Sequence, residues 1–333
     1  MKISSIVDII DGELLSTPSI TSINSIKTES EKVKTADLFI ARNIDDLNIA
    51  IKNGAYAVIF EEDFSVSDTE VAFIKVRNIE KALLSIFRFK LANKNIKAYL
   101  STDISYDLLK SLFSNNHKDI FILPKNIEKI FRFIDNIEDN SIIISNNKEV
   151  LNSIFSSYEI FDKEIDKHSI RNLTIHSLFE LSFSYKNRFY NRIKIAALYI
   201  KSLINCLEFF KDYDIDLTKL NRFKNLKAIF LDKNLNIVDF GKSDKFLISQ
   251  NNLDLVEFEI KFIKEYYKYA KAIFITNSYL DYLNKDEQII IKNIEDLKNI
   301  LDNIEFNSIY LVGFDYLTVL DYFSKPKNLP TLF

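Results

Sequence analysis

Short apolar segments alternate with amphipathic segments along most of this chain, and this alternation constrains the fold more than any other feature. It is most regular in the middle of the sequence, where apolar runs at 96–100, 119–123 and 141–145 are separated by helical patterns at 105–113 and 127–137. Apolar strands that alternate with helices predict a parallel sheet covered on both faces. We therefore expect an α/β protein.

The same alternation is expected before and after this region. Towards the N-terminus the patterns predict helices at 3–10, 46–52 and 78–91 and strands at 20–27, 37–41, 57–60 and 72–76. Towards the C-terminus they predict strands at 228–231, 236–240, 273–276, 288–291 and 308–312 and helices at 255–270, 294–304 and 316–323.

One segment departs from this alternation. In residues 178–193, apolar and polar residues alternate on the N-terminal side of the expected turn Lys186-Asn187-Arg188, which predicts a β-hairpin. A long helix is expected at 196–211. We expect three consecutive α/β units, at 1–93, at 94–219 with the hairpin and long helix at its end, and at 220–333.

Glycine is scarce, and this scarcity excludes the common phosphate-binding loops. The 333 residues include only four glycines, at 12, 54, 241 and 313, and no two are close enough for GxGxxG or GxxxxGK[ST]. Those loops need several positions without a Cβ, where backbone amides can surround a phosphate. Composition biased toward Lys, Asn, Ile, Phe and Tyr accounts for part of the scarcity.

Charge and cysteine content exclude further classes of protein. Lys and Arg number 44 against 47 Asp and Glu, a net charge of −3, and no segment concentrates positive charge as nucleic-acid binding requires. A single cysteine, Cys206, excludes an internal disulfide and a Cys-rich zinc module. The chain shows neither a signal-peptide pattern nor an uncharged apolar run of the roughly 18 residues that span a membrane. We expect a cytoplasmic protein that binds no nucleic acid.

Two segments of the first unit resemble the N-terminal domain of the Mur ligases. Residues 28–41 read TESEKVKTADLFIA and residues 50–59 read AIKNGAYAVI. They are similar to the patterns DSRxVxxGDLFVA and AxxxGAxAVV of the branch that adds D-Ala-D-Ala or the diamino acid to the peptidoglycan precursor. The resemblance implies an N-terminal domain for the UDP-sugar, a central ATPase domain, here reduced, and a C-terminal Rossmann-like domain.

The resemblance also implies substrate-binding positions. In the first unit these are Ser30 and Asp37, which belong to the matching segment. In the third unit, Arg222 stands where the family's Gly-Arg opens the last domain, and Asp239 remains from the family's Asp-Asp pair. Lys242, in the short loop after Gly241, completes the set, because ligands of open α/β sheets enter at strand ends.

The chain departs from the family where phosphate chemistry takes place. Glu31 replaces the arginine of the Asp-Ser-Arg pattern, which places a carboxylate near an anionic nucleotide sugar. The strand ending at Leu100 runs into STDISYD instead of GxxGKT, and Asp103 and Asp107 would repel ATP. Gly313 lies in Val-Gly-Phe instead of the family's Lys-Gly-Ser.

The remaining reactive side chains fit no standard catalytic or metal pattern. His117, His168 and His176 accompany no nucleophile motif, so surface positions are expected for all three. The spacing of His168 and His176 matches no common zinc motif, so we assign no metal ligands and no catalytic residues. Cys206 lies among apolar residues at helical spacing and is expected to be buried.

Together these patterns favour a degenerate Mur-ligase-like protein, a pseudoenzyme without cofactors that binds or scaffolds in bacterial peptidoglycan synthesis. Its partner would be a nucleotide sugar or another protein of that pathway. One alternative is a divergent active ligase or nucleotide-sugar enzyme, which would need ATP and Mg²⁺ and would use Arg222, Asp239 and Lys242. Another is an aromatic-rich protein-interaction module.

Overall fold

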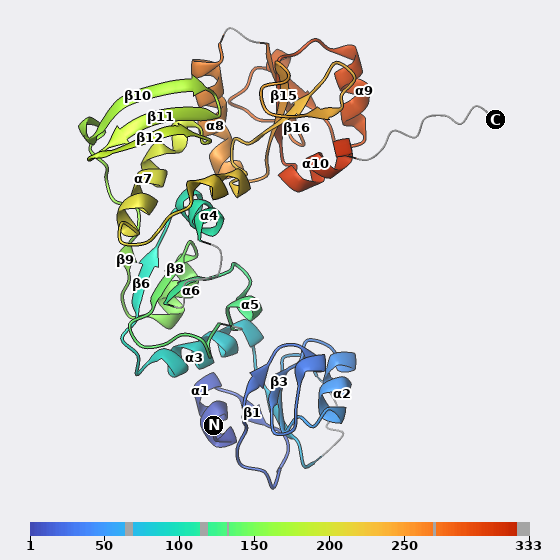
Figure 1. The fold of residues 1–333 in the computed structure, drawn as a ribbon. Helices are drawn as coiled ribbons and strands as arrows, with labels where there is room; N and C mark the ends of the chain where they lie inside the picture. The colour runs from blue at the N-terminus through green and yellow to red at the C-terminus, as the bar shows by residue number, and fades with distance from the viewer. Residues whose placement is uncertain (64–68, 114–118, 132, 269–270, 325–333) are drawn as a thin grey trace, which may run out of the picture. The chain divides into compact units, whose positions relative to one another are not determined.

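The computed structural model describes residues 1–63, 69–113, 119–131, 133–268 and 271–324. Contacts group the chain into two compact units, one made of residues 1–106 and 114–162, the other of 107–113 and 163–333. Each unit contains two sheets with helices packed against them (Figure 1). The fold is α/β, as the sequence predicts. The domain limits at 93/94 and 219/220 stay a prediction.

The first sheet has the strand order β1-β5-β4-β3-β2. Its strands are β1 (Glu13–Leu14), β2 (Ile26–Lys27), β3 (Leu38–Ile40), β4 (Ala57–Phe60) and β5 (Ala72–Lys75), and only β1 pairs antiparallel to its neighbour. Successive residues of a strand face opposite sides. Leu38 and Ile40 accordingly join the core beneath α1 (Ile3–Ile10) and α3 (Ile79–Leu91), and Phe39 joins the core beneath α2 (Ile44–Lys52). Figure 1 shows α1 and α2 on opposite sides of this sheet.

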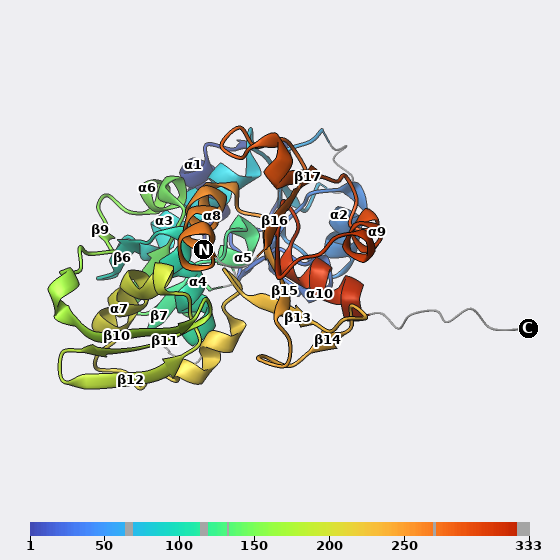
Figure 2. The same cartoon turned by 90° about the horizontal axis from the view of Figure 1, so that it is seen from above.

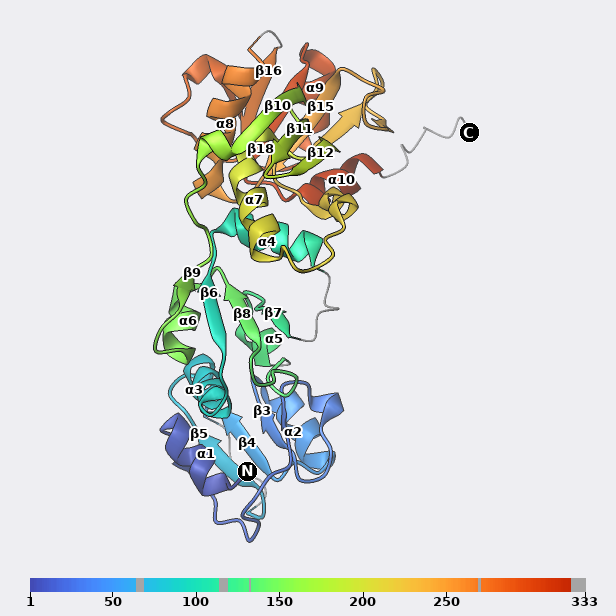
Figure 3. The same cartoon turned by 60° about the vertical axis from the view of Figure 1, so that its left-hand side comes forward.

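The second sheet of this unit is parallel throughout, with the order β7-β8-β6-β9. It consists of β6 (Lys97–Leu100), β7 (Ile120–Ile122), β8 (Ile142–Ser145) and β9 (Glu159–Ile160). Helix α3 packs against both α5 (Ile127–Phe131) and α6 (Lys148–Ile154), and one apolar core therefore joins the two sheets (Figure 3). Helix α4 (Asp103–Leu112) follows β6 directly.

The second unit begins with an antiparallel sheet. The predicted hairpin is confirmed as β11 (Glu180–Tyr185) and β12 (Arg188–Ile193), and the predicted long helix as η3 (Ala197–Tyr199) followed by α7 (Ile200–Phe209). A third strand, β10 (Ile170–Ser177), pairs with β11. Sequence reasoning missed β10 because most of its residues are exposed, so it has no apolar alternation.

The last sheet has six strands in the order β14-β13-β15-β18-β16-β17. They are β13 (Ala228–Leu231), β14 (Ile237–Val238), β15 (Lys245–Gln250), β16 (Ala272–Thr276), β17 (Gln288–Ile290) and β18 (Ser308–Val312). Helix α8 (Leu253–Tyr266) lies on one face, and α9 (Asp296–Asn303) and α10 (Tyr316–Ser324) lie on the other (Figures 1 and 2). Strands β15, β18, β16 and β17 run parallel, whereas β13 runs antiparallel to both of its neighbours, β14 and β15.

Several elements differ from the sequence predictions; the helix expected at 127–137 is described as Ile127–Phe131, and the strand expected at 236–240 is Ile237–Val238. The strand expected at 20–27 is confined to Ile26–Lys27, and β15 was not predicted although it lies inside the sheet. Of the described residues, none belong to a helix with both the length and the hydropathy needed to cross a bilayer.

Candidate functional site

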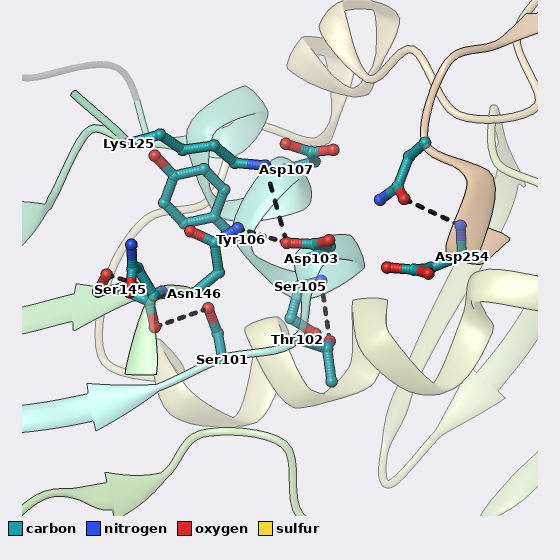
Figure 4. Close-up of polar contacts among 12 residues, drawn as sticks. Ser101, Thr102, Asp103, Ser105, Tyr106, Asp107, Lys125, Ser145, Asn146 and Asp254 are labelled. Atoms are coloured by element: carbon teal, nitrogen blue, oxygen red, sulfur yellow. Dashed lines mark hydrogen bonds and ion pairs between the residues drawn. The ribbon is translucent and has the colours of Figure 1, made fainter. Parts of the chain in front are cut away.

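The turn between β6 and α4 is where a strand–loop–helix protein would hold a phosphate (Figure 4). The Thr102 hydroxyl caps the helix by accepting the Ser105 N–H at 3.3 Å. No glycine lies in this turn. The backbone thus enters α4 through an ordinary side-chain cap, without the glycine turn of a phosphate-binding loop.

A carboxylate from elsewhere in the same unit occupies the start of this helix. Asp162, which follows β9, accepts the Thr102 N–H at 2.7 Å with one oxygen, and its other oxygen accepts the Ser105 hydroxyl. Helix N-termini bind anions because their first N–H groups lack partners and the helix dipole is positive there. Asp162 therefore takes the position that a bound anion would occupy.

A second carboxylate lies in the same turn. Asp103 accepts a hydrogen bond from the Asn146 amide, and the Lys125 ammonium lies 3.9 Å from it (Figure 4). The Lys125 side chain is 68% exposed, so water screens this ion pair. The electrostatic character of the turn is set by Asp103 and Asp162.

The two predicted substrate-binding residues of the first unit are engaged by their own surroundings. Asp37 is buried and accepts the Ser25 hydroxyl at 2.6 Å and the Lys34 N–H at 3.0 Å. Ser30 is buried and donates to Asp46 at 2.9 Å. Both side chains brace the loops around β3, and their assignment to substrate binding stays a prediction.

The predicted residues of the second unit lie on two different segments. Asp239 and Lys242 form one turn, in which the Lys242 N–H donates to the Asp239 carbonyl at 3.1 Å. Arg222 is exposed at the end of η4 (Leu217–Arg222), and no hydrogen bond or ion pair within the described residues joins it to either. The turn leads into the amino end of β15, whereas ligands of open α/β sheets enter at carboxyl ends.

Sequence reasoning missed a buried polar network at the carboxyl end of β15. The Gln250 amide donates to Glu259 at 2.8 Å and to Asn225 at 3.0 Å. Glu259 is fully buried and also accepts the hydroxyls of Tyr199 and Tyr310. Burial raises the pKa of Glu259, although its three hydrogen bonds oppose this shift. The sequence signal that could have located this network is β15 itself, because Gln250 is its last residue and donates to Glu259 of α8.

His168, His176 and Cys206 lie on three different elements, η2 (Lys167–Ser169), β10 and α7. His176 lies 2.8 Å from the Ser182 hydroxyl, and His168 is exposed in a short helical turn; His117 lies outside the described residues. Within those residues, no three Cys, His, Asp or Glu side chains gather as a metal site would require. Cys206 is buried on α7, as predicted.

A cavity of about 300 Å³ lies within the second unit, beside one of the predicted residues. Asp239 lines it, together with residues of η4, β13, β14 and α10. Arg222 and Lys242 do not line it, although Asn221 and Phe223 beside Arg222 do.

Comparisons with known proteins identify the fold. No protein-family model and no curated protein sequence match the chain. Among solved structures, MurF from Acinetobacter baumannii superposes with a TM-score of 0.56 at 10% identity, over 97% of this chain and 98% of that one. MurF from Thermotoga maritima, solved in complex with ADP, superposes with a TM-score of 0.53 at 13% identity, over 90% and 97% of the two chains. The resemblance carried by residues 28–41 and 50–59 is thereby confirmed at the level of architecture, and the protein has the fold of the Mur ligases.

Proposed function

We propose that this protein is a Mur-ligase-like protein without a functional ATP site, which binds or scaffolds in peptidoglycan precursor synthesis. The observation that carries the proposal is that the Asp162 carboxylate accepts hydrogen bonds from Thr102 and Ser105 at the start of α4. The Mur-ligase fold supports the connection to the cell wall, and the filled helix terminus supports the loss of ATP chemistry.

Electrostatics and sterics both act against a triphosphate at this turn. A phosphate would need the N–H of Thr102, which already donates to Asp162 at 2.7 Å. The phosphate would also approach two carboxylates at close range. The repulsion energy between two like unit charges 4 Å apart is about 4 kcal/mol at the effective dielectric constant of a protein surface. MurF from Thermotoga maritima was solved in complex with ADP, so a protein of this fold can bind an adenine nucleotide. We therefore assign the proposed loss of ATP binding to the side chains of this turn and not to the fold.

The test is a titration of the purified protein with Mg²⁺-ATP and with a UDP-N-acetylmuramoyl peptide, followed by calorimetry and phosphate release. We expect no magnesium-dependent hydrolysis and no heat of ATP binding, and we expect the precursor to bind. The variant Ser30→Ala should weaken precursor binding, because Ser30 belongs to the segment that resembles the UDP-sugar domain.

The divergent-enzyme alternative rests on Asp239, because this carboxylate lines a cavity. It predicts magnesium-dependent turnover that is lost in Arg222→Ala and Lys242→Ala but kept in Lys233→Ala, an exposed lysine of the preceding hairpin turn. Turnover with that pattern of losses would replace the proposal by an active ligase or nucleotide-sugar enzyme.

A further inference from the structure

The cavity in the second unit combines an aromatic wall with two lysines that form no ion pair with any described carboxylate. Its volume of about 300 Å³ is at the lower end of small-molecule sites. All of its lining residues belong to the second unit, from Phe179 to Leu320.

One wall of the cavity is a group of packed aromatic rings. Phe230 lies edge-to-face against Phe179, with ring centres 5.9 Å apart, and against Phe240, with ring centres 5.3 Å apart. Phe240 is 45% exposed and stands at the mouth, whereas Phe179 and Phe230 are partly buried. Flat apolar surfaces of this kind favour contact with an aromatic or otherwise planar body.

Lys227 is also part of the lining and supplies positive charge. Its ammonium donates to the Asn221 carbonyl and lies 5.2 Å from the centre of the Tyr316 ring, and both of these residues line the cavity. Within the described part of the chain, Lys227 makes no ion pair. Burial lowers the pKa of Lys227, and neighbouring Lys224 lowers it further. The charge of this ammonium is thus incompletely compensated by the protein itself.

The charged side chains that line the cavity have a small net positive charge. Lys194 lies over the Phe240 ring at 5.5 Å and likewise has no ion pair among the described residues, while Asp239 contributes one carboxylate. Two ammonium groups against one carboxylate fit a singly charged anion better than a cation or a polyanion.

We propose that this cavity binds a small organic monoanion with a flat apolar body, of the aromatic carboxylate or sulfonate class. Its charged group meets Lys227, and its body lies against Phe230 and Phe240. This site is separate from the β6–α4 turn and does not depend on the function proposed above.

The experiment compares two fluorescent probes with the same aromatic body on the full-length protein. 8-Anilino-1-naphthalenesulfonate carries one negative charge, and N-phenyl-1-naphthylamine is its neutral counterpart. Lys227→Met keeps the apolar stem of the side chain but removes its charge. It should lower the affinity for the sulfonate by about tenfold, as expected for the loss of one charge-assisted hydrogen bond. The affinity for the neutral probe should change by less than about twofold. Phe240→Ala should weaken both probes several-fold.

Two matched controls separate this site from adsorption elsewhere. Lys233→Met removes an exposed lysine outside the cavity, and Phe258→Ala removes a side chain that is 66% exposed on α8; neither should change the affinity for either probe. Circular dichroism melts confirm that each variant folds. Equal affinity of the sulfonate for Lys227→Met and the native protein, or equal losses in Phe258→Ala and Phe240→Ala, would overturn the proposal.

Discussion

At the scale of single residues, Glu259 is the most heavily constrained side chain of the second unit. It has no exposed surface, and three side chains donate to it, two tyrosine hydroxyls and the Gln250 amide. Burying a carboxylate is costly unless hydrogen bonds compensate. Burial and the nearby carboxylate raise the pKa of both Tyr199 and Tyr310 well above the ordinary value, so both stay protonated donors. Removing the acceptor in Glu259→Ala should cost about 3 kcal/mol, because three buried donors lose their partner.

The raised pKa of Glu259 predicts a pH dependence of stability with a definite sign. Between the raised folded value and the ordinary value of 4.5, the folded protein binds a proton that the unfolded chain does not. The native protein should therefore gain stability relative to Glu259→Gln as the pH falls through that window. Urea unfolding at a series of pH values measures this, with the exposed Glu257→Gln on the same helix as the control. A native protein that loses stability relative to Glu259→Gln over this range would contradict the prediction.

At the scale of elements, a side-chain amide occupies the space beside the glycine that follows β18. Gly313 has a φ of +85°, and a Cβ at this position would overlap the side-chain amide of Asn277, which follows β16. Gly241 has a similar φ of +79°, but a Cβ there would have no atom within 4 Å. Substitution of the two glycines by alanine therefore distinguishes the stability lost to backbone strain from the stability lost to a steric clash.

We expect Gly241→Ala to cost about 1 kcal/mol and Gly313→Ala about 2–4 kcal/mol, because only the second adds a steric conflict to an unfavourable backbone angle. Urea denaturation of both variants measures the difference. Combining Gly313→Ala with Asn277→Ala should recover part of the excess, since the clashing amide is then removed. Equal costs at the two glycines would show that the strand end relaxes freely.

At the scale of the whole molecule, the chain consists of two compact units, and each of the four sheets belongs to one of them. Chains with more than one unit commonly unfold in more than one step. Phe73 is fully buried in the first unit, and Leu311 is fully buried in the second.

Calorimetry should accordingly resolve two unfolding transitions. Phe73→Ala should lower one transition, at a cost of about 3–5 kcal/mol, and Leu311→Ala should lower the other, at about 2–5 kcal/mol. If either substitution shifted both transitions equally, the two units would unfold as one cooperative body.

Local patterns in the sequence determined the positions of many helices and strands of this protein. Helical spacing predicts α3 to within one residue, and the apolar run at 57–60 coincides with β4. Periodicity succeeds there because each helix or strand buries one or both faces whatever its neighbours are. It fails for β10, whose residues are mostly exposed. The absence of a glycine-rich phosphate loop is also a property of the sequence alone.

Tertiary structure alone decided which distant side chains meet. Asp162 reaches the backbone of Thr102 across 60 positions of sequence, and Tyr199 reaches Glu259 across another 60. Nothing in the local composition marks these pairs, because their approach depends on how strands order themselves within a sheet and how helices pack on it. The sequence shows that the usual phosphate loop is missing, and the fold adds that Asp162 accepts a hydrogen bond from the backbone of the turn between β6 and α4.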